Sequence, residues 1–81
     1  MIIERLRGFL GTEPEFKKKF SEQIKDTDSL VDQGVLDSFG MILLIAFIEQ
    51  TFEINMDTEE LLNNDFTTLE NIEKFVQKKL S

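Results

Sequence analysis

The run from Met41 to Ile48 is apolar at every position, and Phe39 adds a large aromatic side chain just ahead of it. The run is far shorter than the ~20 residues that a membrane-spanning helix requires. It must therefore be covered by other parts of a folded protein or by a partner. We expect this run to form the central helix of the fold, from Ser38 to Glu53. An acidic loop containing Gly34 precedes the helix.

Ser38 lies where this loop meets the helix, which is an unusual place for a hydroxyl group. The backbone N–H groups of a first helical turn lack intrahelical acceptors, and the helix dipole favours an anion there. Either Asp37 or Ser38 is simply the N-cap of the helix, or Ser38 carries an anionic group. The residues alone leave both interpretations open at this point.

The central helix is apolar on two sides. At about 100° per residue, one side is the expected core face and consists of Met41, Leu44, Ile45, Ile48 and Phe52. The opposite side consists of Phe39, Ile42, Leu43, Ala46, Glu49 and Gln50, with Phe47 on the boundary. A bundle of this size cannot cover both faces, so the second face is a candidate docking surface, with Phe39, Ile42 and Leu43 exposed beside Ser38. The alternatives are that the first helix or the loop covers this face, or that the chain self-associates.

The residues before the acidic loop also follow helical spacing. Ile2, Ile3, Leu6, Phe9 and Leu10 fall on one helical face, and Gly11 is a plausible stop. Thr12 and Glu15 have the spacing of a capping box around Pro14, and Phe16, Phe20 and Ile24 then form a stripe. We expect two short helices here, or one helix broken near Gly11–Pro14.

The remaining segments complete a helical pattern. In the long loop 26–37 we expect four apolar side chains to turn inward, namely Leu30, Val31, Val35 and Leu36. Capping boxes at Asp57–Glu60 and Thr67–Glu70 predict a short helix and a final helix. The fold class is therefore all-α: a small three- to four-helix bundle with a long loop between the first and second main helices, in one domain spanning 1–81.

The composition argues against an independent enzyme. The chain has no cysteine and no histidine, so it lacks the usual thiol nucleophile, the usual neutral-pH general base and the commonest metal ligand. No glycine-framed nucleophile elbow surrounds Ser38. Asp26 and Asp28 match the first two positions of a calcium loop, but Leu30 and Val31 stand where a ligand and the glycine belong. We expect neither catalysis nor a bound metal.

The charge is unevenly distributed. Residues 26–73 carry twelve acidic side chains and no lysine or arginine, whereas both ends of the chain are basic and the net charge is −7. This sign argues against nucleic acid as a partner and favours a basic protein surface; the alternative is an acidic surface that only maintains solubility. The N-terminus contains Glu4 and Arg7 within its apolar pattern, unlike a signal peptide, so we expect a cytoplasmic protein. We also expect the protein to be a monomer.

The motif around Ser38 and the helix that follows it resemble a known family. Gly34-Val35-Leu36-Asp37-Ser38-Phe39, followed by the apolar helix, resembles the phosphopantetheine attachment region of acyl carrier proteins. Segment 27–38 is similar to the family's long first loop, 52–54 to the end of its second helix, and 66–72 to the entry of its last helix. Within the family, the motif is closest to D-alanyl and other aminoacyl carrier proteins.

The resemblance implies a function. Phosphopantetheine would be attached to Ser38 by a phosphopantetheinyl transferase, with Asp37 as part of the motif, and would hold acyl or aminoacyl groups as thioesters for fatty-acid, polyketide or related synthesis. Partner enzymes with basic surfaces would meet the docking residues, namely Phe39, Ile42, Leu43, Ala46, Glu49, Glu53, Glu59 and Glu60.

The chain departs from the family pattern on the face beside the serine. Leu43 stands where carriers usually place an acidic residue, and Met41 and Phe47 replace smaller side chains. This face is more apolar than that of a typical fatty-acid carrier. Two alternatives remain: a D-alanyl or aminoacyl carrier, and, from another class, a helical interaction module in which Ser38 is only a cap.

Overall fold

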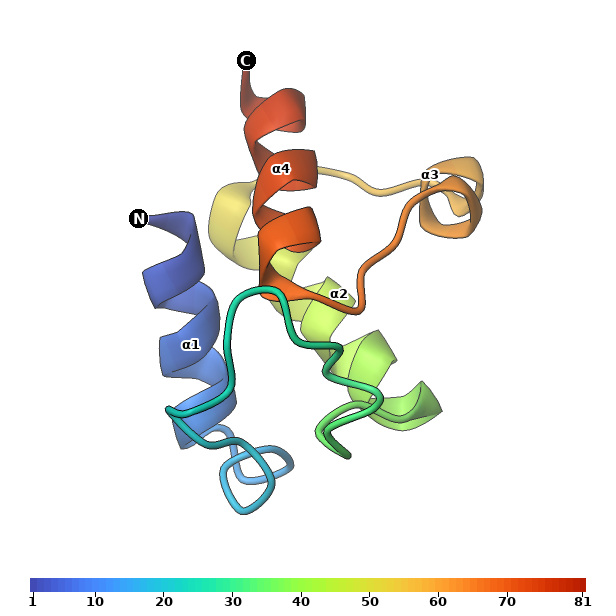
Figure 1. The fold of residues 1–81 in the computed structure, drawn as a ribbon. Helices are drawn as coiled ribbons and strands as arrows, with labels where there is room; N and C mark the ends of the chain where they lie inside the picture. Colours follow the sequence, from blue (N-terminus) through green and yellow to red (C-terminus); the bar gives the residue numbers. More distant parts are fainter.

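The computed structural model describes all residues, 1–81, and is entirely helical apart from its loops. The helices are α1 (Ile2–Thr12), α2 (Ser38–Phe52), α3 (Thr58–Asn63) and α4 (Leu69–Leu80). Figure 1 shows α1 beside α4, with α2 crossing behind α4 and the short α3 held out to one side. None of these helices is both long and apolar enough to cross a membrane. The prediction of a small all-α bundle is confirmed.

One hydrophobic core joins the helices and the loops. Its fully buried members include Leu6 and Leu10 of α1, Leu44 and Ile48 of α2, and three residues of α4, namely Leu69, Ile72 and Val76. The loops between the helices add Phe16, Ile24, Leu30, Val35, Leu36, Met56 and Phe66. Because α3 contributes no fully buried residue, it is the helix that depends least on the core.

The segment between α1 and the acidic loop does not form the predicted second helix. Helix α1 ends at Thr12, and Glu13 adopts an extended backbone with φ −67° and ψ 126°. The residue before a proline is biased towards this conformation, so Pro14 ends α1 and no helix restarts. The Thr12 hydroxyl donates to the carbonyl of Gly8 and caps nothing. Only isolated turns follow, although Phe16 and Ile24 are buried as their stripe predicts.

Backbone hydrogen bonds fix the long loop to α4 and to itself. The Leu30 amide donates to the carbonyl of Thr67 at 2.6 Å, and the Glu70 amide donates to the carbonyl of Asp26 at 3.0 Å. The Leu30 carbonyl accepts from both Val35 and Leu36. Three of the four predicted anchors are therefore buried, but Val31 is 47% exposed, so its predicted inward position is wrong.

The capping residues of α3 and α4 follow the sequence closely. The box of Asp57 and Glu60 is present in both directions. The capping box predicted at Thr67–Glu70 is wrong, because the cap of α4 lies one residue later. Thr68 caps α4 by accepting from the Asn71 amide, because Thr67 instead donates its amide and hydroxyl to Asp65.

Candidate functional site

Asp37 is the N-cap of α2, which leaves Ser38 free. The Asp37 Oδ1 atom accepts a hydrogen bond from the Gly40 amide at 2.7 Å, and its carbonyl accepts from the Met41 amide at 2.9 Å. Ser38 is the first residue of the helix. Its side chain is exposed and its hydroxyl makes no hydrogen bond to the rest of the chain. The open choice between the two caps is thus resolved in favour of Asp37.

The first turn of α2 can hold an anion next to this hydroxyl. The amides of Ser38 and Phe39 have no carbonyl acceptor within the chain, because they precede the first intrahelical bond. The helix dipole adds a partial positive charge at the same end. An exposed hydroxyl beside two unpaired amides is therefore suited to bearing a phosphate group.

The side chain of Phe16, from the segment between α1 and the acidic loop, packs against this turn, a contact that the sequence did not reveal. A Cβ atom at Gly40 would lie only 2.9 Å from Phe16 Cε1 and 3.2 Å from Asp37 Oδ1. Phe16 is fully buried, and its ring lies 5.5 Å from that of Phe9. The glycine two residues after Ser38 in the motif is the only signal of this close approach.

The exposed strip of α2 next to Ser38 is narrower than the sequence predicts. Phe39 is 56% and Ile42 66% exposed, and Ala46 is exposed beside them. Leu43 is half-buried and packs against the core, so its predicted exposure is wrong. The reason is that Phe9 of α1 stacks on Phe47 at 4.0 Å and covers that edge of α2. We call Phe39, Ile42 and Ala46 the exposed strip.

The buried face of α2 is turned relative to the predicted core face. Leu44 and Ile48 are fully buried as expected, and Gly40 is buried with them. Three further residues of the predicted core face are only partly buried, namely Met41, Ile45 and Phe52. Gly40 lies on this buried face, and its lack of a side chain allows the Phe16 ring to approach the helix.

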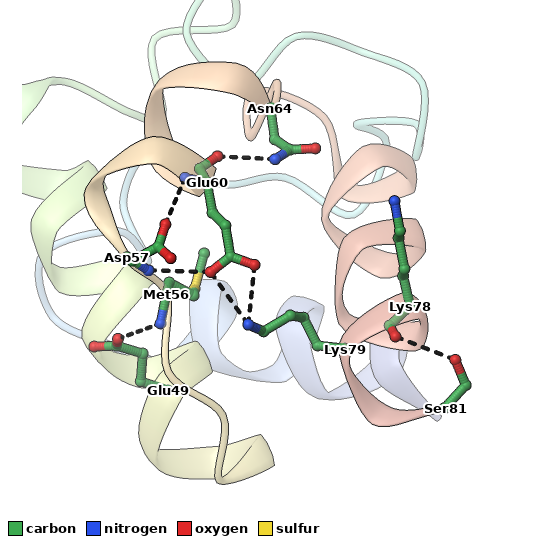
Figure 2. Close-up of polar contacts among 8 residues, drawn as sticks. All are labelled: Glu49, Met56, Asp57, Glu60, Asn64, Lys78, Lys79 and Ser81. Atoms are coloured by element: carbon green, nitrogen blue, oxygen red, sulfur yellow. Dashed lines mark hydrogen bonds and ion pairs between the residues drawn. The ribbon is translucent and has the colours of Figure 1, made fainter.

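The predicted acidic docking residues divide into two kinds. The Glu49 carboxylate accepts from the Met56 amide at 2.9 Å, and the Glu60 carboxylate accepts from Lys79 Nζ at 2.9 Å and from the Asp57 amide at 3.1 Å (Figure 2). Hydrogen bonds from Lys79 and Asp57 lower the pKa of Glu60 below its ordinary value. Glu53 and Glu59 are exposed. Glu49 and Glu60 thus help to hold the α2–α3 link and α3 in place, whereas the side chains of Glu53 and Glu59 make no hydrogen bond or ion pair.

Asp26 and Asp28, which the sequence raised as possible calcium ligands, have other roles. Asp26 accepts from Arg7 at 2.6 Å, which ties the start of the acidic loop to α1. The Asp28 carboxylate accepts from the Lys25 amide at 2.9 Å. Both carboxylates therefore stabilise the loop fold.

The chain belongs to the phosphopantetheine attachment family. The family model described as "Phosphopantetheine attachment site" matches residues 2–76, which include all four helices for most of their length. Members of this family carry phosphopantetheine as a covalent group, so this protein is a carrier protein with that cofactor.

Among curated relatives, the chain is similar to D-alanyl carrier proteins. It is 35% identical to the one from Streptococcus uberis over 65 residues, which cover 78% of this chain and 82% of the relative. It is 34% identical, over the same shares, to that of Streptococcus pyogenes serotype M5. No solved structure gives a match of comparable significance.

Proposed function

We propose that this chain is an aminoacyl carrier protein, with Ser38 as the attachment residue and a D-alanyl group as its cargo. The observation that carries the proposal is the state of Ser38: an exposed hydroxyl, free of hydrogen bonds, on the first turn of α2. Asp37 supports it by capping the helix, so that Ser38 is not needed for that role. The relatives named above support the choice of cargo.

The residues of this chain would position the cofactor rather than perform chemistry. The Ser38 and Phe39 amides would stabilise the phosphate charge, and the Asp37 side chain would keep the turn in place. When bound, phosphopantetheine supplies the thiol that this cysteine-free chain lacks, and that thiol holds the cargo as a thioester. We therefore assign no catalytic residue to the chain itself.

The packing of the interior favours a small cargo over a long acyl chain. The fully buried side chains of α2 and α4 belong to one hydrophobic core. The three hollows on the molecule lie at its surface, and none is lined by any residue of α2 beyond Met41. A long acyl chain would have to displace packed side chains, whereas an alanyl group needs no such space. Fatty-acid or polyketide synthesis is the less favoured alternative.

We propose that the exposed strip, together with Glu53 and Glu59, is the docking surface for partner enzymes. The partners would be a phosphopantetheinyl transferase, an enzyme that activates the amino acid with ATP, and an acceptor enzyme. Apolar side chains next to the reacting end supply contact area, and the exposed carboxylates steer basic surfaces. The protein would act in the cytoplasm, where coenzyme A and ATP are available, as a single monomeric domain spanning 1–81.

The attachment proposal is tested by intact-mass measurement. Wild-type protein, Ser38→Ala and Ser29→Ala are each incubated with coenzyme A and a broad-specificity phosphopantetheinyl transferase. We expect the wild type and Ser29→Ala to gain the mass of one phosphopantetheine group, and Ser38→Ala to gain nothing. Equal modification of Ser38→Ala, or no modification of the wild type, would refute the assignment.

The cargo is tested separately on the modified protein. The holo protein is incubated with ATP and a D-alanine-activating enzyme, and the mass of a D-alanyl group is sought on the arm. The same sample is offered to an enzyme that loads fatty acids onto carriers. Efficient loading with a fatty acid and none with D-alanine would overturn the aminoacyl assignment while leaving the carrier function intact.

A further inference from the structure

A shallow apolar groove adjoins Ser38. It has a volume of about 590 Å³ and is lined by Val31, Leu36, Asp37, Ser38 and Met41. Leu36 forms a buried wall, whereas Val31 is 47% exposed and Met41 is half-buried. The attachment residue is thus part of the groove wall, and the side chains next to it are apolar.

The groove is held in shape by hydrogen bonds. Leu36 donates its amide to the Leu30 carbonyl, and the Leu30 amide in turn donates to Thr67 at 2.6 Å. On the same turn, the Gly34 amide donates to the Val31 carbonyl at 3.0 Å, and Gly34 adopts the positive φ of 78° that this reversal requires. Val31 is therefore kept at the surface by a fixed turn.

The chemistry of the groove selects the kind of occupant. It contains no lysine or arginine, and its only charged group is the Asp37 carboxylate, which already accepts from the Gly40 amide. Beyond the first turn of α2 at Ser38, the side chains of Val31, Leu36 and Met41 offer nothing to a charged group. An apolar group would remove its own surface and that of Val31 and Met41 from water. The two other hollows differ, because asparagine and lysine side chains dominate their lining.

We propose that the groove seats the apolar part of the phosphopantetheine arm itself, the segment next to the phosphate that bears two methyl groups on one carbon. This inference rests on the proposed attachment at Ser38. The arm starts at the groove wall, so its methyl groups reach Val31 and Met41 without diffusing to them. Covalent attachment makes the contact intramolecular, which gives it a high effective concentration.

A seated arm would have a defined direction of departure from α2. The groove lies between the acidic loop and α2, on the side where Met41 and Leu36 are found, and the exposed strip of Phe39, Ile42 and Ala46 occupies another side of the same helix. The seat and the proposed docking surface are thus separate. A partner could bind the strip while the arm leaves the groove for its active site.

The test uses the holo protein and nuclear magnetic resonance. Wild-type protein is loaded from coenzyme A labelled with ¹³C in its pantetheine part, and intact mass verifies the attachment. We expect nuclear Overhauser contacts from the two arm methyl groups to the methyl groups of Val31 and Met41. We also expect the arm methyl signals to differ from those of free pantetheine.

Two matched variants separate the groove from general surface effects. Val31→Ser removes an exposed apolar wall of the groove, and Leu62→Ser removes an apolar side chain of α3 that is 79% exposed and lies outside the groove. In Val31→Ser, the contact to Met41 should weaken and the arm signals should move towards those of free pantetheine. In Leu62→Ser, both should stay as in the wild type.

The failures are distinguishable. If the mass shows no added arm, the assignment of Ser38 fails and the seat fails with it. If the arm is attached but its methyl signals coincide with those of free pantetheine and show no contacts, the seat is overturned while the carrier function stands. An equal response of Val31→Ser and Leu62→Ser would also overturn the seat.

Discussion

At Gly40 the backbone of α2 lies close to the side chain of Phe16. A Cβ atom there would meet the fully buried Phe16 ring at 2.9 Å. Alanine would gain up to about 1 kcal/mol in helix propensity, but overpacking a buried contact costs about 1–3 kcal/mol. We expect Gly40→Ala to lower the free energy of unfolding by about 1 kcal/mol, as measured by urea denaturation.

Gly8 provides the matched control for this substitution. It is an exposed glycine within α1, and a Cβ atom there would meet nothing within 4 Å. Gly8→Ala should therefore raise the free energy of unfolding by up to about 1 kcal/mol. If both variants stabilise the protein equally, the contact between Gly40 and Phe16 does not limit the packing.

Ile42 offers the sharpest test of the exposed strip. It is 66% exposed, so Ile42→Ser should change the free energy of unfolding by no more than about 0.5 kcal/mol. If the strip binds partners, the same change should raise the KM of the phosphopantetheinyl transferase several-fold, because apolar contact area is lost. Leu62→Ser removes an even more exposed apolar side chain, 79% exposed, from α3 and should leave KM unchanged; similar effects of the two variants would argue against a localised docking surface.

Among the elements, α3 has the weakest hold on the rest of the molecule. It contributes no fully buried residue, and Lys79 of α4 reaches across to the Glu60 carboxylate (Figure 2). The pKa of Glu60 is lowered from 4.5 by hydrogen bonds from Lys79 and Asp57. The pKa of Asp65, in the link that follows, is lowered by hydrogen bonds from Thr67. Both carboxylates are therefore stabilising only while they are charged.

The direction of these pKa shifts predicts which segment loses stability first as the pH falls. A carboxylate with a lowered folded-state pKa contributes its full stability above its ordinary pKa, and this contribution is lost as the pH falls through the folded-state value. We expect amide hydrogen exchange of α3 and the 63–68 link, corrected for intrinsic rates, to accelerate below about pH 4.5, before that of α4. Simultaneous loosening of α4 would contradict this order.

A substitution isolates the contribution of Lys79. Lys79→Gln should accelerate exchange in α3 a few-fold at neutral pH and reduce its dependence on acid. Lys74→Gln removes the same charge from α4, but its partner Glu70 lies one turn away in the same helix at 3.8 Å. Lys74→Gln should therefore leave α3 unchanged. Equal effects would mean that net charge, and not the bridge, controls α3.

The elements also show what the sequence could and could not reveal. The apolar run and the box at Asp57–Glu60 are local signals, and each predicted its helix correctly, whereas the sequence left the cap of α2 open between Asp37 and Ser38. The segment after Pro14 has the helical spacing of Phe16, Phe20 and Ile24, yet only turns form there. Its Phe16 side chain packs against Gly40 and Phe9, long-range contacts that local spacing does not encode. The stacking of Phe9 on Phe47, which covers one edge of α2 beside the half-buried Leu43, is another long-range contact of this kind.

Across the whole molecule, the basic ends of the chain meet its acidic middle. Arg7 pairs with Asp26 at 2.6 Å and Lys79 with Glu60 at 2.9 Å, so one bridge joins the N-terminal helix to the acidic loop and another joins α4 to α3. Lys74 pairs with Glu70. Three of the twelve acidic residues between 26 and 73 are thus paired, and the other nine form no ion pair.

This surplus of unpaired acids predicts how salt affects stability. Like charges repel in the folded state, and at 0.2 M salt the screening length is shorter than 10 Å. We expect the Tm at pH 7, followed by circular dichroism, to rise by roughly 2–5 °C between 0.02 and 0.2 M NaCl. The gain from relieved repulsion should exceed the loss from three screened bridges, because exposed ion pairs contribute little.

The control for this prediction is the same salt titration near pH 4.4, where the sequence carries no net charge. Repulsion is then largely absent, and salt acts mainly on the remaining attractive pairs. We expect the Tm to stay level or to fall slightly there. An equal rise at both pH values would show that salt acts on hydrophobic burial rather than on charge. A Tm at pH 7 that does not change with salt would mean that the ion pairs made by the basic ends already offset the repulsion within residues 26–73.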